Sequence, residues 1–171
     1  MNYRIAVLGL LEIFSALSIG VFILALTYKL VKWIGQRYHG IREQENLAYS
    51  IYTASILFSV GYLVSSVIQP LLSSFRLLSQ SESQWLLVFK YLGQGAIYIG
   101  IAYFFAMIIG LLSTLLYARI TPIKEFEEIR NNNIGVAIVV SVIIITLTMM
   151  CKSGVALLIE SIIPYPELPP N

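Results

Sequence analysis

Four ionisable residues stand inside otherwise apolar stretches, and their side chains could do chemistry within a membrane: Glu12, Lys90, Lys152 and Glu160. An unpaired charge at the bilayer centre costs at least about 2.5 kcal/mol, so each should pair, face the protein interior or reach the surface. Glu12 and Lys152 are predicted to lie deepest and at matching depth, which favours a pair between them. The pair is predicted to be either structural or functional, as an ion or proton relay or as the lining of a small outward-facing cavity. We expect Lys90 and Glu160 to reach the headgroups.

Residues for enzymatic or metal chemistry are scarce. His39 is the only histidine and falls in a predicted loop, and Cys151 is the only cysteine. One cysteine forms neither an intramolecular disulfide nor a thiolate metal cage. We find no Ser/His/Asp set, phosphate-binding loop or dinucleotide glycine motif. The sequence therefore predicts no enzyme activity, no metal site and no cofactor.

The composition indicates an integral membrane protein. Of 171 residues, 58% are hydrophobic and only 12% charged, less charge than the surface of a soluble domain of this size needs. The net charge of +2 gives no reason to expect nucleic-acid binding. The length leaves no room for a second, soluble domain, so residues 1–171 are predicted to form one transmembrane domain in the lipid bilayer.

Four long apolar runs predict an all-α, integral membrane four-helix bundle. Each run is long enough to cross a hydrocarbon core of about 30 Å at 1.5 Å per residue. Pro70 is predicted to end the second helix, because proline lacks the backbone N–H that the helix needs. The connector 71–84 is predicted to lie along the membrane surface as a short amphipathic segment. The predicted spans are 5–28, 47–68, 87–117 and 134–160.

The basic residues predict the orientation. Short cytoplasmic loops carry an excess of Lys and Arg. The first and third connectors hold most of these residues, so both loops are assigned to the cytoplasm and both termini to the outside. The residues concerned are Lys29, Lys32, Arg37, Arg42, Arg119, Lys124 and Arg130.

Both of these loops end in an acid-rich segment followed by asparagine and a new apolar run. Aligning Asn46 with Asn133 predicts a tandem repeat of two parallel two-helix units, about 5–70 and 85–164. Asparagine is a preferred N-cap, and acids suit the positive end of a helix, so capping is favoured over binding. The predicted cap and cytoplasmic motif consists of Glu45, Asn46, Glu125, Arg130, Asn132 and Asn133.

The third connector also resembles a known family. The segment Ile120-Thr-Pro-x-x-Glu125-x-x-x-Ile129-Arg-Asn-Asn-Asn133 is similar to the YjfL-type family of bacterial inner-membrane proteins, whose function is unknown. The fourth helix has Val, Ile and Thr where that family favours Ala and Gly, as in a divergent member. The resemblance implies a multi-pass protein of the bacterial cytoplasmic membrane. It also implies partners resembling phage-shock or amide-ligase proteins.

Two functions are left open by the sequence. Small residues at four-residue spacing, such as Ala102, Ala106 and Gly110, favour close helix packing and a homo-oligomer. The charged loops favour a non-enzymatic component of envelope maintenance that docks partner proteins in the cytoplasm. The alternative is a small oligomeric ion or solute channel, or a transporter, that uses Glu12 and Lys152.

Overall fold

The computed structural model describes residues 3–41, 46–71, 84–120 and 125–162, and the described chain forms a bundle of four long helices. These are α1 (Tyr3–His39), α2 (Leu47–Val64), α4 (Gln84–Ile120) and α6 (Ile134–Ile162). A short helix, α5 (Glu125–Arg130), precedes α6. All four long helices are long and apolar enough to cross a membrane. The described residues contain no strand, so the predicted all-α membrane class is confirmed.

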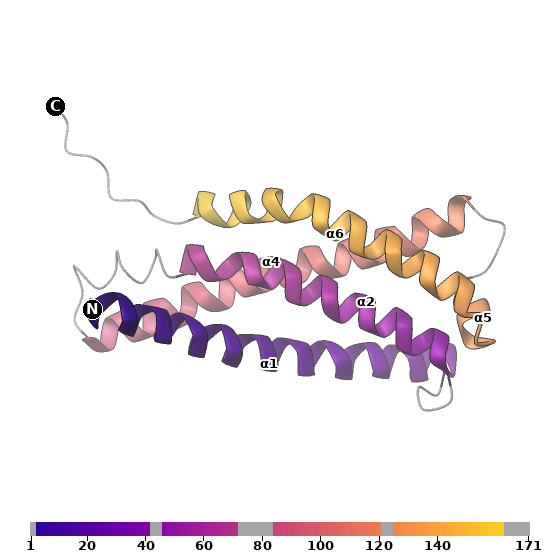
Figure 1. The fold of residues 1–171 in the computed structure, drawn as a ribbon, viewed down its shortest axis with the longest axis horizontal. Coiled ribbons are helices and arrows are strands. Elements are labelled where there is room, and N and C mark those ends of the chain that lie inside the picture. Colours follow the sequence, from indigo (N-terminus) through magenta and orange to yellow (C-terminus); the bar gives the residue numbers. More distant parts are fainter. Residues whose placement is uncertain (1–2, 42–45, 72–83, 121–124, 163–171) are drawn as a thin grey trace.

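Both ends of the described chain lie at the same end of the bundle, as four crossings require (Figure 1). The opposite end carries the connection from α1 to α2, the end of α4, and α5. We call it the loop end, and we call the other the terminal end. Which side of a membrane each end faces stays a prediction.

The helices extend beyond the predicted spans. α1 continues past residue 28 to His39, because nothing breaks the helix before Gly40. Gly40 adopts a φ of +62°, a conformation that glycine reaches without strain, and the Ile41 N–H then bonds back to the Gly35 carbonyl. α4 likewise runs on to Ile120, two residues before Pro122. Both helices are therefore longer than a perpendicular crossing needs.

The prediction that Pro70 ends the second helix is wrong. Helical structure continues through Pro70 to Leu71, after a short 3₁₀ segment, η2 (Ser65–Val67). In an α-helix, Pro70 would leave the Ser66 carbonyl without its donor. The 3₁₀ segment that contains Ser66 directly precedes this turn, and the Ser65 carbonyl there bonds to the Ile68 N–H, three residues ahead. The predicted surface segment of the next connector lies outside the described residues.

α2 is the central helix and the most buried of the four long helices, whereas α1 is the least buried. α2 packs most extensively against α6, and next against α4 and α1. α2 and α6 run in the same direction: the Ser141 hydroxyl donates to the Ile51 carbonyl at 3.4 Å, and Lys152 lies beside Ser65 further along. α1 reaches the bundle mainly through α2 (Figure 1).

Two buried clusters fill the bundle. The one toward the terminal end contains Leu63 and Val67 of α2, Ala102 and Ala106 of α4, and Ile159 of α6. The predicted small residues Ala102 and Ala106 thus pack inside this chain, and the homo-oligomer stays a prediction. The cluster at the loop end brings α2 and α6 together with α1 and α5, through Val31, Ile41, Ala48, Tyr49, Tyr52, Ile129, Val136, Ala137, Val140 and Ile144.

Candidate functional site at the loop end

Asn46 joins the two loops at this end of the bundle. Its side-chain oxygen accepts a hydrogen bond from the Tyr49 N–H at 2.7 Å, so Asn46 is the N-cap of α2. Its side-chain nitrogen donates to the backbone carbonyls of Ile129, at 2.7 Å, and Arg130, at 3.0 Å. Those carbonyls belong to the last turn of α5, where a helix leaves its C=O groups unpaired. The buried side-chain amide of Asn46 therefore forms hydrogen bonds with the first turn of α2 and with the last turn of α5, 83 residues away.

Asn132 makes the reciprocal contact. Its side-chain oxygen accepts from the Ala48 N–H in the first turn of α2, at 3.0 Å. Asn132 has a φ of +62°, the left-handed conformation that asparagine tolerates better than most residues. The Asn133 N–H bonds to the Glu128 carbonyl and the Asn132 N–H to the Ile129 carbonyl, which is the Schellman pattern. The backbone of Asn132 thus ends α5, and its side chain binds the first turn of α2.

Asn133 begins α6. Its side-chain oxygen accepts from the Val136 N–H at 3.3 Å, as Asn46 does from Tyr49 in α2. Its side-chain nitrogen donates to Glu128 Oε2 at 2.8 Å. The two helices that the proposed repeat aligns are therefore capped in the same way, and the repeat itself stays a prediction. We call Asn46, Asn132 and Asn133 together the asparagine clasp.

The helix α5 is held by its apolar side. Ile129 is fully buried, and the Phe126 ring packs edge-on against Tyr52 with centroids 5.9 Å apart. Glu125 is buried as well, and its Oε1 has no hydrogen-bond partner among the described residues. Glu127 and Arg130 are exposed on the other side. α5 therefore covers the end of the bundle and presents charge outward.

Tyr49 fastens α1 to this end. Its hydroxyl donates to the Val31 carbonyl at 2.6 Å, and Gly35 provides the space for the ring, because a β-carbon at residue 35 would overlap it. No sequence motif signals this contact, since it joins one tyrosine to a backbone carbonyl on another helix. A glycine in a helix is at most a hint of close approach.

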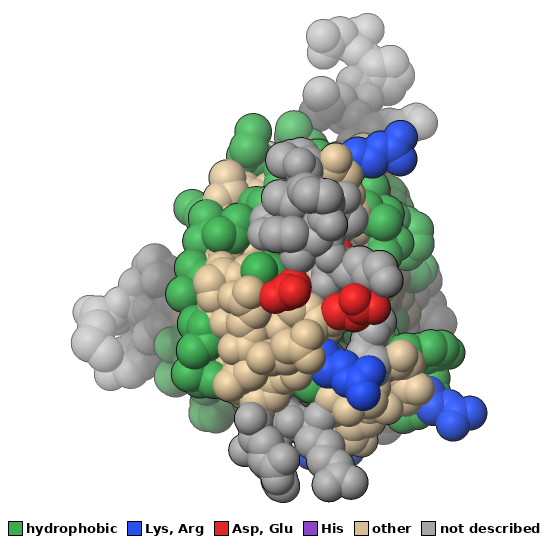
Figure 2. All heavy atoms as spheres, turned by 90° about the vertical axis from the view of Figure 1, so that its right-hand side faces the viewer, with side chains coloured by type: hydrophobic (Ala, Val, Ile, Leu, Met, Phe, Trp, Pro, Cys, Tyr) green, Lys and Arg blue, Asp and Glu red, His purple; other side chains and the backbone are tan. Residues whose placement is uncertain are grey.

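Charged side chains gather over the loop end. Figure 2 views this end and shows acidic and basic groups close together, beside backbone and neutral polar atoms. The exposed ones include Arg37, Arg119, Glu127 and Arg130. Glu45, the remaining member of the predicted motif, lies outside the described residues. The surface of the loop end therefore carries charges of both signs, close to the hydrogen bonds of the asparagine clasp.

Lys152 occupies a different place, toward the terminal end of α6. Its Nζ lies 4.0 Å from the centroid of the Tyr62 ring and donates to Ser65 Oγ at 3.3 Å. Tyr62 belongs to α2 and Ser65 to η2 directly after it, so the lysine links α6 to this helical segment by a cation–π contact and a hydrogen bond. The side chain of Glu12 is not among those described, and its pairing with Lys152 stays a prediction. The same holds for Lys90, whereas Glu160 is exposed near the end of α6.

Some hydroxyls in the bundle interior have no partner among the described residues. They are Thr53 Oγ1 and Ser59 Oγ of α2, and Tyr98 Oη and Tyr103 Oη of α4. Other interior hydroxyls bond to the carbonyl one turn back, as Thr27 and Thr148 do. Two of these hydroxyls belong to α2, which thus places polar atoms without a described partner inside the bundle. Among the described residues, no group of three or more His, Cys, Asp or Glu could hold a metal ion.

Fold and site together define a multi-pass α-helical membrane protein whose loop end is closed by a capping helix. Residues 5–155 match the family described as Domain of Unknown Function (DUF350), and the chain belongs to that family. The expected membership of a family without assigned function is thereby supported, while the YjfL-type designation and the bacterial origin stay predictions. Comparisons with curated proteins and with solved structures found no match.

Proposed function

We propose that this protein is a non-enzymatic component of bacterial envelope maintenance that docks soluble partner proteins at its loop end. The observation that carries the proposal is the helix α5, which is anchored on its apolar side and turns Glu127 and Arg130 outward. A docking surface benefits from being pre-organised, because less conformational entropy is then lost on binding. The asparagine clasp supplies that order.

The location of the loop end in the cytoplasm is part of the proposal. It rests on the basic residues of the two connectors and on the positive-inside rule. A surface with charges of both signs suits a protein partner better than it suits a purely anionic partner. Complementary charged patches steer the association of two proteins and set the orientation of the partner. Partners resembling phage-shock or amide-ligase proteins are proposed only from the family resemblance, as is the inner membrane of a bacterium.

A photo-crosslinking residue at position 127, in native membranes, tests this proposal. We expect a discrete adduct from position 127 and none from a matched probe at Ser161, which is exposed near the end of α6. Charge reversal by Arg130→Glu in the protein that carries the probe should weaken the adduct, because it inverts the remaining outward charge of α5. A discrete adduct of equal yield from both positions, or none from position 127, would contradict docking at the loop end.

A channel or transporter is the second candidate, and the unpaired interior hydroxyls together with Lys152 favour it. Polar groups inside a membrane bundle often mark an ion or solute path. Flux of ions and small solutes into liposomes would decide between the two. Flux that is lost in both Glu12→Gln and Lys152→Met, with helical content and particle size unchanged, would support transport. Flux no greater than in empty liposomes would contradict it for the solutes tested.

A further inference from the structure

The last three turns of α1 carry a basic and aromatic surface, which we call the basic face. It consists of Lys29, Lys32, Trp33, Arg37 and Tyr38. Lys29, Trp33 and Arg37 follow one another at four-residue intervals, so they lie along one side of the helix over about 12 Å. Trp33 is 55% exposed and Tyr38 is 70% exposed, and their rings meet edge-on with centroids 5.8 Å apart. Two large rings thus stand on the outer surface beside the cations.

The basic face has no acidic residue to balance it. Residues 28–39 hold three Lys or Arg and no Asp or Glu. Lys29 and Arg37 are exposed, and neither forms an ion pair with a described residue. The negative end of the helix dipole attracts cations within the last turn, which accounts for Arg37. It does not account for Lys29, which lies ten residues before the end of α1.

Two contacts place the basic face at the level where α2 begins. The Tyr49 hydroxyl donates to the Val31 carbonyl, and the Tyr49 ring lies against Gly35. Tyr49 belongs to the first turn of α2, directly after its N-cap Asn46. Residues 31–35 of α1 therefore lie beside the start of α2, where the apolar helices give way to the asparagine clasp and the exposed charges of α5.

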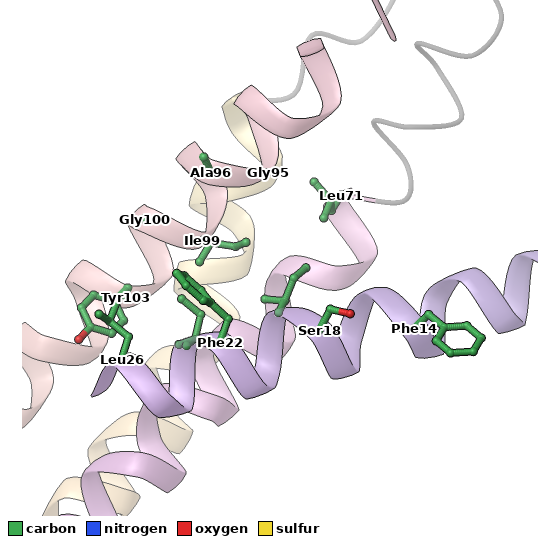
Figure 3. Close-up of a pocket in the computed structure, with 12 residues that line it drawn as sticks. Phe14, Ser18, Phe22, Leu26, Leu71, Gly95, Ala96, Ile99, Gly100 and Tyr103 are labelled. Atoms are coloured by element: carbon green, nitrogen blue, oxygen red, sulfur yellow. The ribbon is translucent and has the colours of Figure 1, made fainter. Parts of the chain in front are cut away.

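Towards the terminal end, the surface of α1 is hydrocarbon. Phe22 is 66% exposed, and Leu26 is exposed as well. Both line an apolar groove between α1 and α4, and Figure 3 shows them on the side of α1 that borders α4. Apolar side chains of this kind face acyl chains in a bilayer, whereas Trp and Lys prefer the next level, that of the headgroups. The basic face therefore lies at the headgroups of the leaflet on the loop-end side.

We propose that the basic face binds the headgroups of anionic phospholipids and enriches these lipids beside α1. Each cation near an anionic membrane surface strengthens binding about fivefold. A soluble acidic partner is the weaker fit, because it would reach Arg37 first and leave Lys29, about 12 Å deeper, without a counterion. This lipid site is on α1 and does not depend on a protein partner docking at α5.

Trp33 itself reports on the lipid beside the basic face once Trp85, the other tryptophan, is replaced by Phe. The protein is reconstituted in phosphatidylcholine that contains a small fraction of phospholipid brominated in the upper part of its tails, which quenches nearby tryptophan. We expect brominated phosphatidylglycerol to associate with the site at least about fivefold more strongly than brominated phosphatidylcholine. Lys29→Gln with Arg37→Gln should remove this preference.

Arg119→Gln is the matched control for Arg37→Gln alone, because Arg119 is an exposed arginine at the end of α4. The control should keep the preference that Arg37→Gln weakens. Equal association of the two lipids with the unaltered face would overturn the proposal, and so would a preference that survives the loss of Lys29 and Arg37. Equal weakening by both single variants would also overturn it, because net charge rather than the face would then attract the lipid.

Inorganic phosphate, added at the concentration of the anionic lipid, separates a lipid site from a site for free phosphate. We expect it to leave the quenching of Trp33 unchanged, because the acyl chains hold the lipid headgroup at the level of the face. Loss of the lipid preference on adding phosphate would overturn the proposal in favour of a site for the free anion.

A tryptophan moved to α4 tests the face while all three of its cations stay in place. Trp33→Phe, Trp85→Phe and Leu115→Trp put the single reporter on α4 near the loop end, where Leu115 is 55% exposed. Quenching at position 115 should show little preference between the two brominated lipids. A preference as strong as at position 33 would mean that anionic lipid gathers around the whole bundle, which would overturn a site on α1.

Discussion

The two ends of the bundle are built by different means. At the loop end, the asparagine clasp and Tyr49 join α1, α2, α5 and α6 through directional hydrogen bonds to backbone groups. At the terminal end, the contact between α1 and α4 is apolar and opens into a groove of about 690 Å³. Backbone groups left unpaired at helix ends demand partners, whereas apolar side chains accept lipid as readily as protein. The comparison teaches that directional hydrogen bonds fix the geometry of the loop end, whereas apolar packing alone sets the contact between α1 and α4.

The largest effect is expected from Asn46→Ala, which removes the N-cap of α2 and the side-chain hydrogen bonds to the Ile129 and Arg130 carbonyls of α5. We expect the free energy of unfolding to fall by about 2–4 kcal/mol. Steric trapping in bicelles measures this quantity. Asn133→Ala, which removes the exposed bond to Glu128 and one longer cap bond, is the control and should cost less. Equal losses would show that Asn46 does not join the loops energetically.

The next effect tests the close approach of α1 and α2. Gly35→Ala should lower the free energy of unfolding by about 1–2 kcal/mol, because the added β-carbon overlaps Tyr49. Gly100→Ala, in the groove, should leave stability unchanged or raise it by up to about 1 kcal/mol, since alanine favours helix and nothing obstructs it. The same unfolding assay compares the two. If Gly100→Ala lowered the free energy of unfolding as much as Gly35→Ala, the helices would be packed as tightly at Gly100 as at Gly35. That result would contradict the difference between the two ends of the bundle.

A smaller difference separates two replacements of Asn132. Asn132→Gly keeps the positive φ and loses only the bond to the Ala48 N–H, so we expect a cost of about 1 kcal/mol. Asn132→Ala loses the bond and also strains the backbone, which should add about 1 kcal/mol. Unfolding of the two variants side by side measures the strain. If Ala were no worse than Gly, the left-handed turn would not be required there.

The smallest effect is expected at Lys152. A double-mutant cycle with Lys152→Met and Tyr62→Leu should give a coupling energy of about 0.5–1 kcal/mol, the usual size of a cation–π contact. Lys152→Met alone should change stability by less, because removing a charge from an apolar helix offsets the lost contacts. A coupling near zero in the unfolding assay would mean that Lys152 is not held by Tyr62 in solution.

Much of the loop-end chemistry could be expected from the residues alone. Asparagine before an apolar run predicts an N-cap by a local rule, and both Asn46 and Asn133 accept the bond that such a cap makes. The second bonds of Asn46, to Ile129 and Arg130, follow from no local rule, because they join residues more than 80 positions apart. The prediction at Pro70 failed for a related reason: the chain passes through a short 3₁₀ segment before the proline and stays helical, which local rules do not foresee.

The sequence by itself determined the four apolar helices, their membrane character and the asparagine caps, since hydropathy and capping act between residues close in the chain. Tertiary structure alone decided that α2 is central and that α5 closes one end. It also decided that Lys152 lies on Tyr62, and that α1 leaves α4 at the terminal end. In lipid, no hydrophobic force selects which apolar faces meet. Packing shape and a few polar contacts between distant residues make that choice.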